Sequence, residues 1–273
     1  MKLLLVGCGA MGSSLLQGWM NSSTSFERIT VISPHLENAE NFQNYSQVQF
    51  YHAIEEISDS NWDVILFAVK PKVLPLILKD YQKLISEKTI FISIAAALTL
   101  SSISEGLGAG ACCARVMPNT PVIINKGVCG LLMEPNTSSQ SRSVLEGLFA
   151  PLGDVIWVES DEVLDNITAI SGCGPAYVFH MIEAISEAAQ DLGFSADQAL
   201  KLAKGTLWGA SNYAHNTKTS PEDLRIAVTS PGGMTEAALE VLMGDFGLKS
   251  LIKGALKAAL QRSEDIRTHG SKP

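Results

Sequence analysis

Residues 2–12 read Lys-Leu-Leu-Leu-Val-Gly-Cys-Gly-Ala-Met-Gly, an apolar strand that runs directly into a glycine-rich turn. In this pattern Gly7 permits the tight turn, Gly9 lets a pyrophosphate approach the backbone, and Gly12 lets a following helix pack on the strand. The N-terminus of that helix offers N–H groups and a positive dipole end to phosphates. We therefore expect this loop to bind a dinucleotide, through Gly7, Cys8, Gly9, Ala10, Met11 and Gly12.

The rest of the N-terminal half alternates short apolar runs with helical patterns. Continuously apolar strands are typical of a parallel sheet that helices cover on both faces. Two further strands, 128–133 and 155–158, look like a hairpin pair around a helix at 138–149, and we expect an antiparallel edge there. The pattern predicts an α/β, Rossmann-like domain. Its other expected strands are 2–6, 28–32, 48–50, 63–69, 89–94 and 111–117.

The pattern changes after residue 158. From there apolar residues recur three or four positions apart, as they do on helices, and no strong strand signal remains. Gly193 ends one helix, and Ser195 with Gln198 forms a capping box that opens the next. We expect an all-α domain to follow the Rossmann-like one, with a dinucleotide-binding domain over residues 1–159 and a helical domain over residues 160–273.

Glycines and prolines lie inside helices and at helix starts of this helical half. Gly205 and Gly209 lie inside the helix after Ser195, where each costs about 1 kcal/mol relative to Ala. Either another backbone approaches this helix closely, or the helix is kinked or tolerates the glycines. Pro221 and Pro231 indicate two later helix starts, each preceded by a serine as candidate N-cap.

The composition excludes several classes of function. Of the 273 residues 46% are hydrophobic and 18% charged, as in a folded globular protein. The net charge of −8 leaves no basic excess for nucleic acid or a membrane surface. No apolar run approaches the ~20 residues of a membrane span, and the N-terminal one is too short for a leader, so we expect a cytoplasmic protein. The five cysteines and five histidines form no metal-like cluster, and we expect no metal.

Other strand ends supply further candidates, because ligands of open α/β sheets bind at the carboxyl ends of the strands. The second strand ends at Ser33, without the Asp or Glu that NAD-selective sites place there. This leaves room for a 2′-phosphate, although no Arg accompanies it. Asn119 lies in a loop that two prolines stiffen, and it can bind a carboxamide such as that of nicotinamide. The candidates at the strand ends are Ser33, Ala68, Val69, Lys70, Pro71, Ala95 and Asn119.

A second glycine-rich turn lies in the helical half, where residues 228–235 read Val-Thr-Ser-Pro-Gly-Gly-Met-Thr. Bare N–H groups at Gly232 and Gly233, with the hydroxyls of Ser230 and Thr235, form an anion nest at a helix start. Ordinary helix capping without a ligand is the simpler alternative for an isolated Ser-Pro-Gly-Gly.

The order of these segments resembles the pyrroline-5-carboxylate reductases over nearly the whole chain. That order is Gly-x-Gly-x-Met-Gly, Ala-Val-Lys-Pro, Met-Pro-Asn-Thr-Pro, Ser-Gly-x-Gly-Pro-Ala-Tyr and Val-Thr-Ser-Pro-Gly-Gly. The resemblance implies a Rossmann-like domain and a helical domain that dimerises, with an active site shared between two chains. It implies the NAD(P)H-dependent reduction of the C=N bond of 1-pyrroline-5-carboxylate to L-proline, the last step of proline biosynthesis.

The resemblance also assigns roles to residues. Ser33 would bind the adenosine ribose or its 2′-phosphate, and Thr235 would act near the ring nitrogen as the catalytic residue. The pyrophosphate would be bound by Gly7, Gly9, Met11 and Gly12. The ribose and nicotinamide end would be lined by Ala68, Lys70, Pro71, Ala95 and Asn119. The substrate carboxylate would be bound by Ser230, Gly232, Gly233, Met234 and Thr235.

Three positions depart from the family pattern. Met234 stands where the family often has Thr, which keeps an N–H donor but loses a hydroxyl. Cys173 replaces a common Ser, and Ile54 stands where an Asn often helps to hold the adenosine. The change at Ile54 bears on coenzyme choice, and we expect NADPH to be preferred modestly, with NADH also accepted.

Two other classes fit parts of the pattern. A related imine or β-hydroxyacid dehydrogenase would share the architecture, but the hydroxyacid enzymes generally rely on a helix-borne Lys. The helix that begins near Pro175 has none before Lys201. A non-catalytic NADP-binding regulator would keep the fold but would not need the anion nest at residues 228–235.

A protonated cyclic imine accepts hydride without a catalytic His or metal, so the protein mainly has to hold C4 of the dihydronicotinamide against C5 of the ring.

Overall fold

A computed structural model describes residues 1–36 and 39–269 of the chain. The chain divides into two compact units, Met1–Cys173 with Ala259–Pro273 and Gly174–Ala258. The expected boundary between residues 159 and 160 falls inside the first unit, because Leu164 is fully buried in the core of that unit. The domain bounds of 1–159 and 160–273 therefore stay a prediction, and the compact units divide after Cys173.

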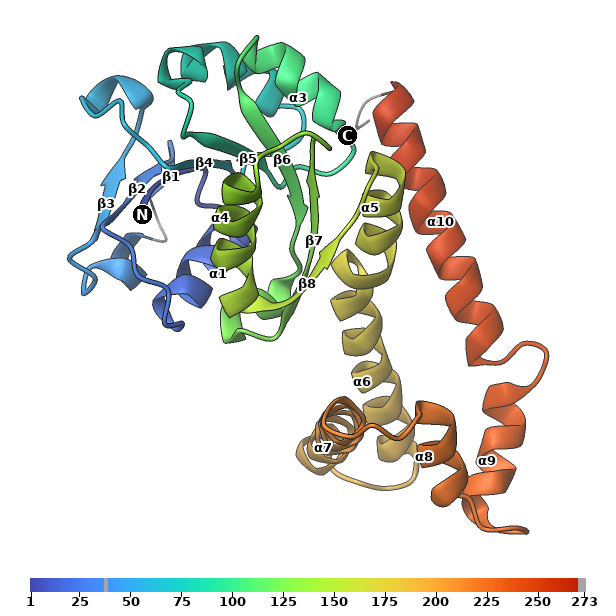
Figure 1. Cartoon of the computed structure of the whole chain (residues 1–273). Helices are drawn as coiled ribbons and strands as arrows, with labels where there is room; N and C mark the ends of the chain where they lie inside the picture. Colours follow the sequence, from blue (N-terminus) through green and yellow to red (C-terminus); the bar gives the residue numbers. More distant parts are fainter. Residues whose placement is uncertain (37–38, 270–273) are drawn as a thin grey trace. The chain divides into compact units, whose positions relative to one another are not determined.

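The first unit is built on an eight-stranded sheet in the order β3-β2-β1-β4-β5-β6-β7-β8, counted over the residues that the structure describes (Figure 1). Neighbouring strands from β3 to β6 are parallel. The order reverses beside β1, which places a topological switch point at the carboxyl ends of β1 and β4. The strands are β1 (Lys2–Val6), β2 (Arg28–Ile32), β3 (Val48–Tyr51), β4 (Val64–Phe67), β5 (Ile90–Ser93), β6 (Cys112–Met117), β7 (Gly127–Met133) and β8 (Gly153–Trp157).

All eight expected strands are present, but the expected hairpin-like pairing of the last two is wrong. Strands β7 and β8 are parallel to each other, and the antiparallel step lies between β6 and β7. Helix α4 (Ser139–Phe149) connects β7 to β8. A helical crossover brings the chain back in the same direction, whereas a hairpin needs a short turn. The antiparallel edge therefore consists of β7 and β8 together.

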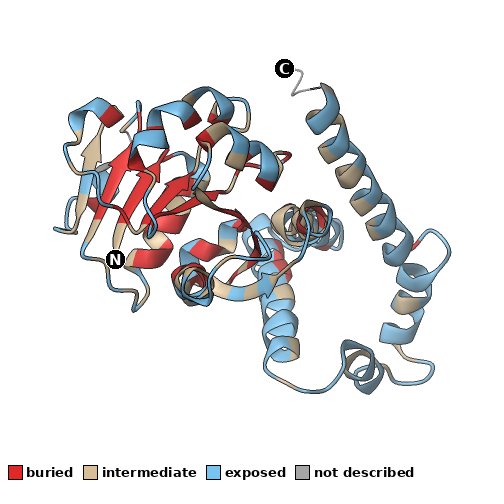
Figure 2. Ribbon diagram, turned by 45° about the horizontal axis from the view of Figure 1, so that its top comes forward, coloured by how far each residue is buried: buried red, intermediate tan, exposed pale blue. Residues whose placement is uncertain are grey.

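Helices cover both faces of the sheet, and alternate strand residues feed two separate cores. Leu3 and Leu5 of β1 join the core that α1 (Ala10–Met20) and α4 cover. Leu4 and Val6 join the core that α3 (Leu100–Leu107) covers. Figure 2 shows these strands as the buried centre of the unit. The remaining helical segments of the first unit are η1 (Ala39–Phe42), η2 (Ile54–Glu56), α2 (Leu74–Ile77), η3 (Leu78–Leu84), η4 (Thr120–Ile124), η5 (Ala150–Leu152), α5 (Asp161–Ile167) and the π-helical η6 (Thr168–Gly172).

The second unit is helical throughout, as expected. Gly193, with φ +95°, ends the helix before it, and Ser195 with Gln198 forms the predicted capping box. Ser220 caps the helix that begins at Pro221, which confirms that expected start as well. The helices are α6 (Gly174–Asp191), α7 (Ala196–His215), α8 (Pro221–Ala227), α9 (Met234–Met243) and α10 (Leu248–His269), the last of which ends in the first unit.

A buried charge cluster joins three elements of the first unit. Arg115 of β6 is fully buried and forms an ion pair with Asp161, and its Nη2 lies 3.6 Å from Oδ1 of Asp165. Asp165 in turn pairs with Arg267 near the end of α10. Burial lowers the pKa of Arg115 below its ordinary value. Because a buried charge without a partner is very unfavourable, these pairs hold α5 and the end of α10 on the sheet.

None of the helices that the structure describes combines the length and the apolar character that a membrane span requires.

Candidate active site

The glycine-rich loop follows β1 and opens α1, as expected, and two of its glycines are required by the fold. Gly7 has φ +97°, and a methyl group on it would lie 2.6 Å from the carbonyl oxygen of Ala68. A methyl group on Gly12 would lie 2.4 Å from the carbonyl oxygen of Gly7. Both contacts involve backbone atoms, which cannot turn aside as a flexible side chain can. The absence of a side chain at Gly7 therefore lets the turn pack against the end of β4. The absence of a side chain at Gly12 lets α1 pack against the turn.

Gly9 is different, because none of the residues that the structure describes requires a glycine there. It is exposed, its φ of −74° suits any residue, and a methyl group on it would meet no atom within 4 Å. Gly9 is also the N-cap residue of α1, which has no side-chain cap and no acidic residue in its first turn. The first-turn N–H groups of a helix have no partner within it. The loop therefore has the open backbone and the dipole end that suit a pyrophosphate.

The carboxyl ends of the neighbouring strands meet at this loop. The Gly7 N–H donates to the carbonyl of Ile32 at 2.7 Å, and the Ala68 N–H donates to that of Val6 at 2.7 Å. Lys70 is exposed in the turn after β4, between the half-buried Val69 and Pro71. Ala95, which is buried, follows β5, the strand paired with β4. The predicted residues of this edge thus lie at the ends of adjacent strands.

Ser33 is at the end of β2, as expected, but its side chain is already engaged. It is 5% exposed, and its hydroxyl donates to the carbonyl of His35 at 2.8 Å. A hydroxyl has one hydrogen, so Ser33 must turn before it can donate to a phosphate. Ile54 is buried in the core beside the sheet, which keeps its side chain away from solvent. Neither side chain offers a ready donor to a 2′-phosphate in this arrangement.

Asn119 has a structural role that the sequence did not reveal. Its Nδ2 donates to the carbonyl of Ser171 at 2.9 Å, and its Oδ1 accepts from the N–H of Val128 at 2.8 Å. The residue is 6% exposed. Both ends of the carboxamide therefore connect β6 and β7 to the η6 segment. A contact with nicotinamide would have to use the second N–H of Nδ2.

The second glycine-rich turn precedes α9 in the helical unit. Gly232 has φ +70°, and the Gly233 N–H donates to the carbonyl of Ser230 at 3.0 Å. The expectation that Ser230 caps this helix is wrong. Because the left-handed Gly232 turns the chain after Pro231, the helix begins at Met234 with Gly233 as its N-cap and without a side-chain cap.

The turn also contains a carboxylate that the motif alone does not indicate. The Gly232 N–H donates to Oε2 of Glu236 at 2.6 Å, so a carboxylate already lies on the nest. The spacing could have revealed it, since Glu236 is three residues after the N-cap, where capping-box acids reach back. Met234 is 92% exposed, and Thr235 is exposed as well, so both are accessible in this chain.

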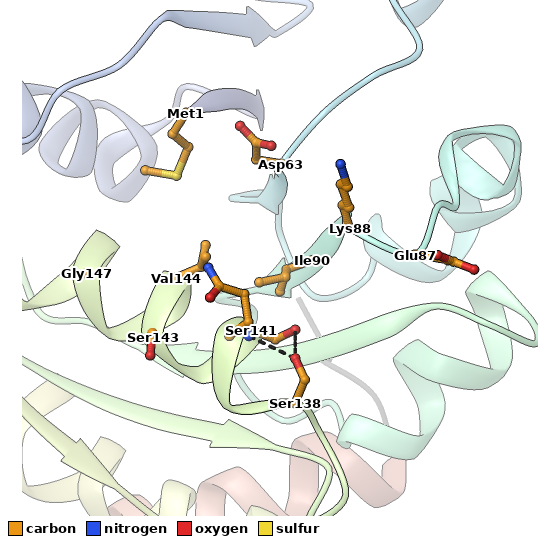
Figure 3. Close-up of a pocket in the computed structure, with 11 residues that line it drawn as sticks. Met1, Asp63, Glu87, Lys88, Ile90, Ser138, Ser141, Ser143, Val144 and Gly147 are labelled. Atoms are coloured by element: carbon orange, nitrogen blue, oxygen red, sulfur yellow. Dashed lines mark hydrogen bonds between the residues drawn. The ribbon is translucent and has the colours of Figure 1, made fainter.

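A cavity of the first unit, shown in Figure 3, is not lined by residues of the glycine-rich loop. It has a volume of about 680 Å³, and its lining includes Met1, Asp63, Ile90 and Ser141. Met1 and Asp63 directly precede β1 and β4, and Ile90 is the first residue of β5. The cavity therefore lies at the amino ends of the parallel strands. Ligands of such sheets bind at the opposite, carboxyl ends.

A glycine loop at a helix N-terminus, placed at the switch point of a parallel sheet, defines a dinucleotide-binding protein. Two family models match the chain, and they agree with this class. Residues 2–97 match the coenzyme F420-dependent NADP oxidoreductases, and residues 161–266 match the pyrroline-5-carboxylate reductase dimerisation domain. The class is that of the NADP-dependent oxidoreductases.

Individual relatives cover almost the whole chain. A pyrroline-5-carboxylate reductase of Bacillus subtilis is 31% identical over 97% of this chain and 95% of its own length. The Pseudomonas aeruginosa reductase is 29% identical over 97% of this chain and 96% of its own length. The chain belongs to the pyrroline-5-carboxylate reductase family.

Solved structures agree with this assignment. The reductase of Coxiella burnetii has a TM-score of 0.87 and 32% identity, covering 99% of this chain and 98% of its own. The Plasmodium falciparum reductase, solved with NADP bound, has a TM-score of 0.83 and 27% identity over the same shares. The resemblance seen in the sequence is confirmed, and with it the fold class and the assignment as an oxidoreductase. The chain also carries the domain through which this family self-associates.

Proposed function

We propose that this chain reduces the C=N bond of 1-pyrroline-5-carboxylate to L-proline, with NADPH as the hydride donor. The observation that carries the proposal is that two glycine-rich turns each lead into a helix that has no side-chain cap, the loop at Gly9 and the turn at Gly232. Their presence suits a dinucleotide and a carboxylate substrate, and relatives named for this reaction cover nearly the whole chain.

The proposed coenzyme site is at the carboxyl edge of the sheet. The open position at Gly9 fits the close approach of a pyrophosphate, with first-turn N–H groups of α1 as donors. When bound, the dihydronicotinamide supplies the hydride. The residues proposed for the pyrophosphate are Gly7, Cys8, Gly9, Ala10, Met11 and Gly12. Those proposed for the ribose and nicotinamide are Ala68, Val69, Lys70, Pro71, Ala95 and Asn119.

The proposed preference for NADPH over NADH rests on the end of β2. An acidic residue at this position would bind a 2′-hydroxyl and repel a 2′-phosphate, and here the residue is Ser33. Because the Ser33 hydroxyl is engaged by His35, it gives the phosphate little direct help in this orientation. We therefore propose a modest preference.

The proposed substrate site is the turn before α9. Its N–H groups bind the carboxylate and so orient the ring. Thr235 lies in the first turn of the helix, where its hydroxyl oxygen accepts from the N–H of the protonated ring nitrogen. Met234 contributes its backbone N–H, since its side chain has no donor. This clamp is the main requirement for a protonated imine, which is already an electrophile. The proposed substrate-binding residues are Ser230, Gly232, Gly233, Met234 and Thr235, and Thr235 is the proposed catalytic residue.

We propose a homodimer or a higher oligomer formed through the helical unit. Trp208 of α7 is 73% exposed and Phe246, after α9, is 92% exposed, which is unusual for large apolar side chains in water. Within the described part of the chain, a methyl group on Gly205 or Gly209 would meet no atom within 4 Å beyond its chain neighbours and the nearby backbone of its own helix, so a partner helix can approach there. Light scattering at micromolar concentration should give at least twice the 29.2 kDa chain mass.

The proposed compartment is the cytoplasm. Cys113 and Cys129 are buried thiols, as expected in a reducing environment.

The test of the function is NADPH oxidation with and without pyrroline-5-carboxylate. Oxidation that depends on the imine supports the proposal. Tight NADPH binding without imine-dependent turnover would instead indicate a regulator that kept the fold. Parallel assays with β-hydroxyacids and NADP⁺ address the related dehydrogenases, and α6 lacks the lysine that those enzymes use.

A further inference from the structure

The turn before α9 holds a carboxylate of the chain itself. Oε2 of Glu236 accepts from the Gly232 N–H at 2.6 Å, a short contact of the kind that charge strengthens. Gly232 has φ +70° and lies directly before the N-cap residue, Gly233. The Glu236 side chain therefore lies on the backbone donors that the proposed function assigns to the carboxylate of the substrate.

The donors of this turn are few, which makes their occupation significant. The Gly233 N–H is taken by the carbonyl of Ser230 within the turn. The first intrahelical bond of α9 runs from the Ala237 N–H to the carbonyl of Gly233. The donors that remain for an incoming anion are those of the first helical turn and Gly232. One of them already has a negatively charged partner.

Two carboxylates cannot share one N–H without strong repulsion. Like charges a few ångströms apart repel even at a protein surface, although solvent reduces the effect. Glu236 is exposed, so its side chain can rotate into solvent without breaking a core contact. An incoming carboxylate can therefore take the Gly232 N–H only if Glu236 leaves it.

We infer that Glu236 competes internally with the carboxylate of the substrate and so sets substrate affinity. This inference rests on the proposed function of the same turn. With no substrate, Glu236 satisfies the Gly232 N–H and keeps other anions off the positive end of α9. When the substrate binds, the carboxylate of Glu236 is displaced from the Gly232 N–H. The free energy that this displacement requires weakens substrate binding and so raises the KM. Glu236 is thus a specificity-determining residue rather than a catalytic one.

The test compares three variants of the full-length protein. Glu236→Ala removes both the charge and the acceptor, and it should lower the KM for pyrroline-5-carboxylate about tenfold, or about 1.4 kcal/mol. Glu236→Gln keeps an acceptor but removes the charge, and it should give a smaller decrease of the KM. Glu240→Gln is the matched control, because it removes the same charge one turn further along α9 and should not change the KM.

A second readout separates competition from simple helix capping. Inhibition constants are measured for L-proline, which has a carboxylate, and for L-prolinamide, which has none. Glu236→Ala should improve inhibition by L-proline about tenfold and leave that by L-prolinamide unchanged. A loss of helix stability would weaken both probes together, so it cannot produce this result. Glu236→Gln, which is isosteric, keeps the comparison available if the alanine variant is unstable.

The outcomes also separate this inference from the proposed function. If the wild type shows no imine-dependent NADPH oxidation, the proposed function fails first. If the wild type is active and Thr235→Val is impaired, but the Glu236 variants have an unchanged or higher KM, only the competition fails. A lower kcat in Glu236→Gln would instead place Glu236 at the ring nitrogen and overturn the inference.

Discussion

Replacing Gly12 by alanine tests whether the glycine loop is a packing device as well as a binding device. The added methyl group would lie 2.4 Å from the Gly7 carbonyl oxygen, and real Cβ atoms do not come this close. Overpacking typically costs about 1–3 kcal/mol, and the higher helix propensity of alanine offsets about 0.5–1 kcal/mol. Because the obstructing atom is backbone, we expect a net loss of about 2 kcal/mol in the free energy of unfolding.

Gly147→Ala is the matched control for this change. Gly147 also lies in a helix, α4, but a methyl group there would meet no atom within 4 Å. We expect this variant to gain about 0.5–1 kcal/mol from helix propensity alone. Urea unfolding of the two variants, followed by circular dichroism, gives both changes under identical conditions. Replacing glycine by alanine is thus expected to lower the free energy of unfolding at position 12 and to raise it at position 147.

Gly9→Ala completes the comparison, since it separates binding from stability. The fold leaves room for the methyl group, so the free energy of unfolding should change by less than about 1 kcal/mol, as for a weak N-cap. The Kd for NADPH should rise about 10- to 100-fold, because a charged hydrogen bond to the pyrophosphate is lost or lengthened. Titration of NADPH fluorescence measures it. An unchanged Kd for Gly9→Ala, or a stable Gly12→Ala, would refute this account of the loop.

Four further predictions address other parts of the protein. Thr235→Val should lower kcat/KM about 10- to 100-fold while the Kd for NADPH stays near that of the wild type; an unchanged kcat/KM in a folded variant excludes Thr235 from the mechanism. Ser33→Asp should shift the ratio of kcat/KM for the two coenzymes toward NADH, and a wild type that already prefers NADH would contradict the interpretation of β2. Arg115→Met should cost about 3–5 kcal/mol in urea unfolding, because it leaves the half-buried Asp161 without its cation and the buried Asp165 with Arg267 alone, and a neutral result would mean that the cluster is not stabilising. Burial raises the pKa of the Cys129 thiol to about 12, so a thiol reagent at pH 8 should label Cys129 only after the protein unfolds. Because the native state keeps this proton to a higher pH than the unfolded state, the free energy of unfolding should fall as the pH rises from about 9 toward 12. Rapid labelling of Cys129 in the native protein would contradict this prediction.

Much of the fold is readable from the sequence, because its causes are local. A buried parallel strand needs a continuous apolar run, as in β1 and β4, and each of the eight predicted strands lies on a strand of the sheet. The direction of β8 is not local, since it depends on where the crossover through α4 brings the chain back. Local sequence does not determine where the first unit ends either. Leu164 looks like any apolar helix residue until its burial against the sheet is seen.

The same distinction between local and non-local causes applies to the residues of the candidate site. The spacing of Gly7, Gly9 and Gly12 identifies a dinucleotide loop, because a tight turn into a helix constrains neighbouring residues directly. The partners of Asn119 lie 9 and 52 residues further along the chain, so no local pattern indicates that its carboxamide is engaged. The carboxylate of Glu236 lies on Gly232 because the left-handed turn and the first turn of α9 bring them together. Sequence determines which groups are present, but the tertiary structure decides which of them are still available to a ligand, because a hydrogen bond depends on the position of both partners.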